Sequence, residues 1–242
     1  MLRAFIYIVI GKFKNKIIQK GTRKLTQMNK NHAKSIKGLN LIDNGENNTI
    51  EIDETCVFER SVITIDGNNN HVSLGKALSY RQLSIHLKED NKRITVQQST
   101  KHIIGLKISS TRGSNQEVSI GNNFSCGGIE MRLNDGDETL TIGDNCLFSW
   151  GIHARTSDGH SIIDRETNKP INFPENIKIG DRVWICEDVR LMKGSVIPSE
   201  TVVGAASLVT KKFEEQFTVI AGVPAKVVRR NVKWDGKQPS KY

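Results

Sequence analysis

The sequence predicts an all-β fold in which short strands wind into a solenoid. A six-residue repeat begins at Ile179 and reads IGDRVW, ICEDVR, LMKGSV, IPSETV, VGAASL and VTKKFE. The hydrophobic fraction is 37% and the aromatic fraction is 6%, which suits a narrow core lined by small aliphatic side chains. A period of six excludes an amphipathic helix and an ordinary half-buried strand, whose patterns repeat at about 3.6 and 2 residues.

The repeat predicts which side chains face the interior. The first position of every unit is aliphatic: Ile179, Ile185, Leu191, Ile197, Val203 and Val209. The fifth position of the first five units is small or β-branched: Val183, Val189, Ser195, Thr201 and Ser207. Three units, each a short strand and a turn, close one triangular coil, so that the first residues stack from coil to coil. Gly180 and Asp181 tolerate the tight turn between units.

The same pattern continues upstream in pieces. Residues 142–147 (IGDNCL), 148–153 (FSWGIH) and 120–125 (IGNNFS) fit it. Between Asn44 and Leu74, short β-prone runs alternate with Asn/Gly turns, which indicates degenerate early coils. We therefore expect one solenoid domain over residues 39–220.

Two segments break the repeat. Residues 154–176 are polar and contain two prolines, which predicts an insertion loop projecting from the coils. Residues 221–234 (AGVPAKVVRRNVKW) leave the period after Pro224 and predict a strand or helix covering the last coil. We assign residues 221–242 to a C-terminal cap and tail.

Residues 1–38 form a basic arm. The formal net charge is +9, and the first 42 residues hold ten Lys or Arg but no acid. Apolar residues recur at spacings of three and four, which predicts a basic amphipathic helix: Leu2, Phe5, Ile6, Val9, Phe13 and Ile17. Such a helix packs on its own solenoid or a partner subunit, or residues 1–24 adhere to an anionic membrane. No nucleic-acid recognition motif accompanies the charge.

Cysteine pattern and hydropathy predict a cytoplasmic protein, at the inner face of the membrane if the arm binds there. No stretch reaches the roughly 18 to 20 apolar residues of a membrane span, and no signal-peptide cleavage site follows residues 4–10. The cysteines show neither a CxxC pair nor metal-ligand spacing: Cys56, Cys126, Cys146 and Cys186. We interpret them as small hydrophobic residues in a reducing compartment and expect no metal site.

Five motifs together resemble one known family. The hexads, the SDGH loop, VWIC, GAASLVTK and AGVPAKVVR are similar to the hexapeptide-repeat acetyltransferases, above all those that O-acetylate sugars and capsular polysaccharides. The resemblance is strong over residues 142–234 and weak before residue 120. It implies a left-handed parallel β-helix and a homotrimer with active sites between neighbouring subunits. It also implies O-acetyl transfer from acetyl-CoA to a sugar or polysaccharide hydroxyl.

The resemblance assigns the general base to His160, which precedes the V-W-I motif by the family's interval. A sugar hydroxyl is a poor nucleophile, and imidazole titrates near neutral pH, so it can accept the hydroxyl proton during attack on the thioester. Direct transfer then needs no acyl-enzyme. Asp158 is a candidate to orient the imidazole, and His153 is the rival base.

The resemblance also assigns residues to acetyl-CoA. It implies that Trp184 walls the pantetheine, and it places Ala205, Thr210 and Lys211 beside the cofactor and Lys226 and Arg229 at its phosphates. The alternatives are a corner-covering role for Trp184 and a solvated basic face. Two departures affect the groove: Cys186 stands where the family commonly has Gly, and residues 211–217 are one residue longer.

Other functions remain open at this stage. Transfer to an amino sugar or to serine fits the same motifs, because loops supply the acceptor contacts. A zinc carbonic anhydrase of similar fold would need about three converging histidines, and no histidine follows His160. A non-enzymatic solenoid gives no reason for a histidine-bearing loop at this spacing.

Overall fold

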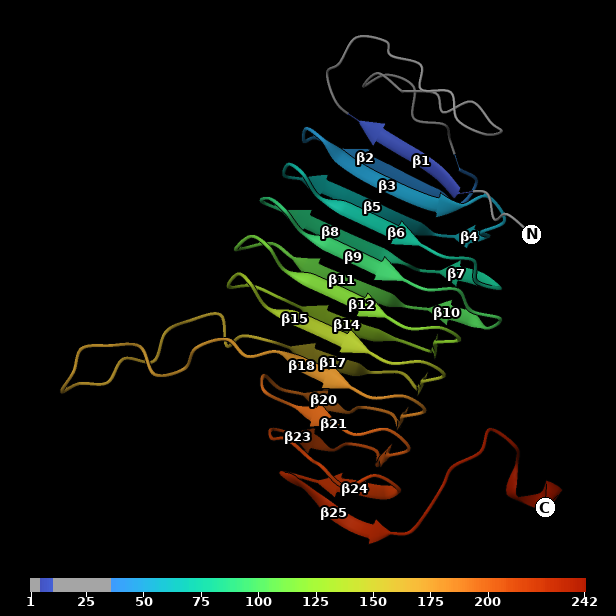
Figure 1. Ribbon diagram of the computed structural model, residues 1–242, viewed down its shortest axis with the longest axis vertical. Helices are drawn as coiled ribbons and strands as arrows, with labels where there is room; N and C mark the ends of the chain where they lie inside the picture. The colour runs from blue at the N-terminus through green and yellow to red at the C-terminus, as the bar shows by residue number, and fades with distance from the viewer. Residues whose placement is uncertain (1–4, 11–35) are drawn as a thin grey trace.

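Three parallel sheets wrap around one core in the computed structural model, which describes residues 5–10 and 36–242 (Figure 1). Successive strands pass from sheet A to sheet C to sheet B and back to sheet A. Sheet A contains, in spatial order, β1 (Phe5–Ile10), β3 (Asn48–Asp53), β6 (His71–Leu74), β9 (Arg93–Val96), β12 (Glu117–Ile120), β15 (Thr139–Ile142), β18 (Ile177–Ile179) and β21 (Val196–Ile197). The predicted parallel β-solenoid is confirmed.

The other two sheets complete the prism. Sheet B contains β2 (Leu39–Asp43), β5 (Ser61–Asp66), β8 (Ser84–Lys88), β11 (Leu106–Ser110), β14 (Ile129–Arg132), β17 (Ile152–Arg155), β20 (Arg190–Leu191) and β23 (Leu208–Val209). Sheet C contains β4 (Phe58–Glu59), β7 (Ser79–Arg81), β10 (His102–Ile104), β13 (Ser125–Cys126), β16 (Leu147–Phe148), β19 (Trp184–Ile185), β22 (Val202–Val203), β24 (Thr218–Gly222) and β25 (Ala225–Arg230). A short 3-10 helix, Pro239–Lys241, lies near the C-terminus.

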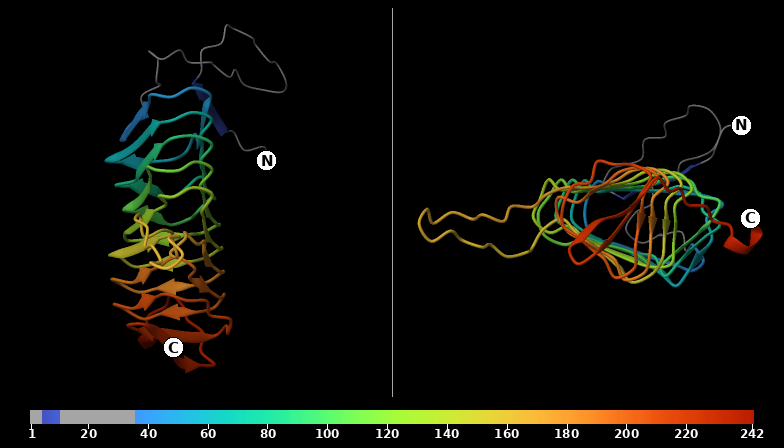
Figure 2. Two further views of the ribbon diagram at one scale, coloured as in Figure 1. Left: turned by 90° about the vertical axis from the view of Figure 1, so that its left-hand side faces the viewer. Right: turned by 90° about the horizontal axis from the view of Figure 1, so that it is seen from below.

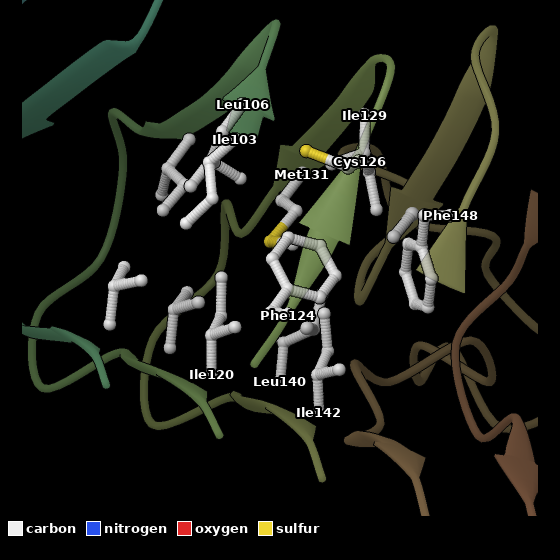
Figure 3. Packing of buried hydrophobic residues seen from close by; sticks show 14 of the residues in the cluster. Ile103, Leu106, Ile120, Phe124, Cys126, Ile129, Met131, Leu140, Ile142 and Phe148 are labelled. Atoms are coloured by element: carbon white, nitrogen blue, oxygen red, sulfur yellow. The ribbon is translucent and has the colours of Figure 1, made fainter. Parts of the chain in front are cut away.

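The interior is a continuous stack of aliphatic and aromatic side chains. All six predicted first-position residues are buried, with Ile179 the most exposed at 2%. The fifth-position residues are buried as well. Further up the stack, the rings of Phe124 and Phe148 meet edge to face with centroids 5.1 Å apart (Figure 3). Inward stacking of equivalent residues therefore stabilises both the regular and the degenerate coils.

The coils come in two sizes. Upstream of the insertion loop, neighbouring coils are offset by about 22 residues, as between the hydrogen-bonded Asn48 and Asn70. Downstream of the loop the offset is 18 residues, as between Arg182 and Glu200. We call these the wide coils (residues 39–155) and the hexad coils (residues 177–220). The extra residues of a wide coil lie between its sheet B strand and the following sheet A strand, at the B–A corner.

Buried polar side chains occupy this corner in the wide coils. Buried residues lie at the start of five sheet A strands, each at most 2% exposed: Asn48 is the first residue of its strand, and Asn70, Lys92, Gln116 and Glu138 each immediately precede theirs. Lys92 Nζ donates to the Ser110 carbonyl oxygen at 2.8 Å and to its hydroxyl at 2.9 Å. The longer corner exposes backbone groups to the interior, and these side chains satisfy them.

The two ends of the solenoid are covered differently. At the C-terminal end, β24 and β25 form an antiparallel hairpin over the last coil, so the predicted cap is a strand pair. At the N-terminal end, β1 pairs antiparallel with β3. The predicted helix was wrong for residues 5–10, because the run FIYIVI is rich in β-branched and aromatic residues and meets an open sheet edge. The remainder of the predicted helix lies outside the described residues.

Candidate functional site

The insertion loop leaves the solenoid between β17 and β18, at the B–A corner, and extends far from the coils (Figures 1 and 2). Its base is tied to the wide coils. Ser157 Oγ donates to Asp135 Oδ2 at 2.6 Å and accepts from the Gly159 N–H at 2.9 Å. Arg112 Nη2 donates to the Gly159 carbonyl at 3.1 Å. Gly159, the residue before His160, is thus hydrogen-bonded through both its N–H and its carbonyl group.

Asp158 braces the loop rather than the imidazole. Its Oδ2 accepts from Lys193 Nζ at 2.5 Å and from Asn172 Nδ2 at 2.9 Å. The hydrogen bond from Lys193, followed by that from Asn172, lowers the pKa of Asp158 below its usual range. Asn172 Nδ2 also donates to the His160 carbonyl at 2.8 Å, so Asp158 reaches His160 through the backbone. Sequence reasoning missed Lys193 and Asn172, which stand at turn and loop positions with no distinguishing spacing.

His160 is exposed on this braced loop. Within the described part of the chain, its imidazole makes no hydrogen bond or ion pair. The structure therefore places the predicted base on a fixed backbone with a free side chain, and does not bring it to Asp158 as the sequence had suggested.

Trp184 lies on the opposite side of the prism, on the outer face of sheet C. Its strand partners in register are Val202, then Val219, then Arg229, so these four residues form one column along the solenoid. At roughly 4.8 Å per strand step, the column runs about 14 Å from Trp184 to Arg229. Two predicted cofactor residues thus share one face.

The C-terminal tail also contacts this face. Trp234 packs against Trp184 with ring centroids 6.2 Å apart, and its Nε1 donates to the Arg182 carbonyl at 2.5 Å. The Arg182 guanidinium lies 5.5 Å from the Trp234 ring centroid. No sequence pattern predicts this contact, because Trp234 and Trp184 lie 50 residues apart and Trp234 falls in the segment assigned to the C-terminal cap and tail.

The other predicted cofactor residues are exposed at separate places on the hexad coils and the C-terminal hairpin. Ala205 lies in the turn between β22 and β23, whereas Thr210 and Lys211 follow β23 at the end of sheet B. Lys226 is on β25 beside Arg229. No single face of one chain therefore collects all six predicted cofactor residues.

The loop and Trp184 lie on opposite sides of one chain. Because strands pass from sheet A to C to B, the B–A corner that carries the loop faces away from sheet C. The view along the solenoid shows the loop on one side and the C-terminal tail on the other (Figure 2). One chain cannot bring His160 to Trp184.

A groove of about 280 Å³ crosses the outer face of sheet B beside the loop base. Its lining residues come from β14, β17, β20 and the turn after β20: Glu130, Arg132, His153, Arg155, Arg190 and Met192. His153, the rival base, lies here with its Nδ1 3.5 Å from Glu130 Oε2. The structure thus places the two histidines in different surroundings, one on the loop and one in the groove.

The described residues contain no group of three His, Cys, Asp or Glu side chains placed to hold a metal ion. None of their helices has the length and apolar character needed to cross a membrane.

Comparisons with known proteins agree on one kind of enzyme. No protein-family model matches the chain. A polysialic acid O-acetyltransferase from Neisseria meningitidis is 32% identical over 195 residues, covering 81% of this chain and 89% of the relative. A galactoside O-acetyltransferase from Escherichia coli K12 is 32% identical and is covered over 76% of its length. The solved structure of the polysialic acid O-acetyltransferase OatWY superposes with a TM-score of 0.66 at 28% identity, covering 82% of this chain and 92% of that one.

Proposed function

The chain belongs to the hexapeptide-repeat O-acetyltransferases of sugars and polysaccharides, and from that premise we propose a site shared by two subunits with His160 as its general base. The acetyl donor is acetyl-CoA, and the acceptor is a hydroxyl of an acidic polysaccharide. Its relatives named for polysialic acid support the acidic acceptor.

The proposal rests on one observation: the insertion loop and the Trp184 column lie on opposite sides of the same chain. The loop projects away from its own solenoid, and Lys193, Asp158 and Asn172 hold its base in place. A loop that is held at its base and extends away from the described part of its own solenoid suits a contact with a neighbouring subunit. If the neighbour presents its sheet C, His160 of one subunit meets acetyl-CoA bound along the Trp184 column of the next. A homotrimer closes such a head-to-tail arrangement.

The reaction needs one proton acceptor. His160 takes the proton of the sugar hydroxyl as the oxygen attacks the thioester carbonyl. The tetrahedral intermediate collapses, the carbon–sulfur bond breaks, and the imidazolium returns the proton to the CoA thiolate. The thioester supplies the activation, so no side chain of this protein needs to carry the acetyl group.

In this proposal acetyl-CoA lies along the outer face of sheet C. The indole of Trp184 offers an apolar wall for the pantetheine, and Arg229 lies at the other end of the column, where a phosphate can accept a charge-assisted hydrogen bond. Lys226 adds a second cation on the same strand. Contact of residues 1–24 with an anionic membrane stays a prediction.

Mixing two inactive variants tests the shared site. We expect His160→Ala to lower kcat by roughly 10² to 10⁴. The double variant Trp184→Ala/Arg229→Ala should lose about 100-fold in kcat/KM for acetyl-CoA, at about 10-fold for each group. Trimers assembled from equal amounts of both should recover about a quarter of the wild-type activity, because random assembly pairs an intact loop with an intact column that often.

Three controls make the mixing experiment decisive. Each variant assembled only with itself should remain inactive. His71→Ala removes a histidine from sheet A, remote from the loop, and should leave kcat unchanged. Retained activity in His160→Ala would overturn the base assignment, and absence of recovery in the mixed trimers would overturn the shared site.

A further inference from the structure

The groove on sheet B concentrates positive charge beside the catalytic loop. Three guanidinium groups, those of Arg132, Arg155 and Arg190, line it together with a single carboxylate, that of Glu130. In register, Arg132 pairs with Arg155 and His153 pairs with Arg190, on adjacent strands. Like charges on neighbouring strands of one face destabilise a sheet unless an anion lies between them.

The carboxylate of Glu130 is already engaged within the groove. Its Oε1 accepts a hydrogen bond from Arg132 Nε at 2.7 Å and lies 2.6 Å from Arg132 Nη2 in an ion pair. Both nitrogens of Arg132 contact the same oxygen, and the other oxygen of Glu130, Oε2, lies 3.5 Å from His153 Nδ1. Within the groove lining, Arg155 and Arg190 therefore have no carboxylate of their own, and outside it the Asp158 carboxylate interacts electrostatically with Arg155.

Arg155 and Arg190 differ from other arginines in the C-terminal half of the chain. Arg182 pairs with Glu200 at 2.7 Å, and Arg230 pairs with Glu215 at 2.9 Å. Within the described residues, neither Arg155 nor Arg190 forms an ion pair. Arg155 Nε is moreover buried and has no hydrogen-bond partner among those residues. A buried, unpartnered guanidinium nitrogen is costly and indicates a missing acceptor.

Arg155 also connects the groove to the loop. A Cβ placed on Gly159 would lie 3.8 Å from Arg155 Nη2 and 3.0 Å from Arg112 Nη2. The Arg155 guanidinium thus packs against the residue that precedes His160. A ligand held by Arg155 lies at the foot of the loop that carries the general base.

We propose that Arg155 and Arg190 bind the carboxylate of an acidic sugar in the acceptor polymer, next to the sugar that receives the acetyl group. The inference rests on the proposed function. Planar guanidinium groups match a carboxylate in two-point hydrogen bonding, and Met192 gives the sugar an apolar floor. The groove thereby selects acidic over neutral polysaccharides.

Substitution of the two arginines tests this selectivity. Arg155→Gln and Arg190→Gln should each raise KM for polysialic acid about 10-fold, the loss of one charge-assisted contact, and the double variant should lose about 100-fold. kcat and KM for acetyl-CoA should stay at wild-type values. Arg190→Lys should restore only part of the loss, because an ammonium lacks the two-point geometry.

Two matched controls separate carboxylate recognition from general charge. Lys178→Gln removes one positive charge from sheet A at the level of the loop and should leave every constant unchanged. Polysialic acid with its carboxyl groups reduced to alcohols should bind wild type and variants equally weakly. An equal loss in Lys178→Gln would overturn the proposal. So would a rise in KM for acetyl-CoA, which would assign the arginines to the CoA phosphates.

Direct binding keeps this test independent of the transfer reaction. Polysialic acid binding to the unloaded protein, measured by calorimetry, should weaken in both arginine variants and remain normal in His160→Ala. That outcome supports the groove even if no acetyl transfer to the polymer occurs. If wild type does not bind polysialic acid but still acetylates a neutral galactoside, the carboxylate site is wrong and the O-acetyltransferase function stands.

Discussion

The wide coils and the hexad coils solve the same packing problem with different corners. A hexad coil turns each corner with the fewest residues, as at Gly194 and Ser195, and its sequence period is therefore visible. A wide coil adds residues at the B–A corner and fills the space with Asn48, Asn70 and their equivalents. The difference shows that a strict period marks minimal turns, and that its absence does not mark the end of a solenoid.

The two regions also carry different parts of the proposed active site. The Trp184 column lies on the hexad coils, and most of the arginine groove lies on the wide coils. The insertion loop leaves the chain where one type of coil gives way to the other. The change in coil size thus places the proposed base at the boundary between donor and acceptor surfaces.

The largest expected effect compares one corner residue from each region. Glu138 accepts hydrogen bonds from the backbone N–H groups of Asn134, Asp135 and Gly136, at 3.1, 2.8 and 2.6 Å. Glu138→Ala leaves these donors unsatisfied and should lower the free energy of unfolding by about 3 to 5 kcal/mol. Ser195→Ala, which removes a hydroxyl bonded to the Val209 carbonyl, should cost only about 1 kcal/mol.

Denaturant midpoints of the two variants give this comparison directly. Glu138→Gln keeps one acceptor oxygen and should fall between wild type and Glu138→Ala. Equal losses in Glu138→Ala and Ser195→Ala would mean that the two kinds of corner are stabilised alike.

A smaller effect is expected on the hexad side, where two indoles lie together. Trp184→Ala should raise KM for acetyl-CoA about 10-fold, since an aromatic wall contributes about 1.4 kcal/mol. Trp234→Ala removes only the outer ring and should raise KM about threefold. Neither should change KM for the polysaccharide. A larger effect of Trp234→Ala than of Trp184→Ala would place the cofactor on the tail rather than on the column.

A third effect is a pH dependence confined to the wide coils. Burial lowers the pKa of Lys92 to about 8 from 10.5, outweighing the opposing charges of Glu89, Glu138 and Asp90. Between those pH values the unfolded chain binds a proton that the folded chain has released, so the free energy of unfolding rises with pH relative to Lys92→Met. Unfolding curves of wild type and Lys92→Met from pH 7 to 10.5 measure the difference in their free energies of unfolding. The buried thiols are present in both proteins, so their contribution cancels in this difference. Parallel stability profiles would show that Lys92 has an ordinary pKa when folded.

The sequence predicted the hexad coils well because each position has one task. The first-position residues from Ile179 to Val209 recur at a fixed interval and face inward, and the family motifs in these coils and in the adjoining insertion loop carry Trp184 and His160. The wide coils were recognised only in fragments, because the residues of their long corners are individually ordinary. The prediction of a helix over residues 5–10 failed where an open sheet edge outweighed a helical spacing of apolar residues.

The candidate site was harder to predict because its contacts join distant segments. Asp158 lies two residues from His160, but its partner Lys193 belongs to a later coil. No sequence motif marks the three arginines of the groove, Arg132, Arg155 and Arg190. They meet only because they lie on the same face of successive sheet B strands. The Asp158–Lys193 contact and the arginine cluster both depend on the register between coils, which cannot be read directly from the sequence.

The parallel stacking of nearly independent coils has a consequence for how such an enzyme can diversify. Each coil contacts only its neighbours, so duplication or loss of a wide coil changes the height of the prism by one strand spacing, roughly 4.8 Å, and leaves the remaining register intact. Added coils would lengthen the sheet faces along which a polymer can lie, without altering the insertion loop or the residues around it. Specificity for the length of the polymer can therefore evolve through the number of coils, separately from the chemistry of acetyl transfer.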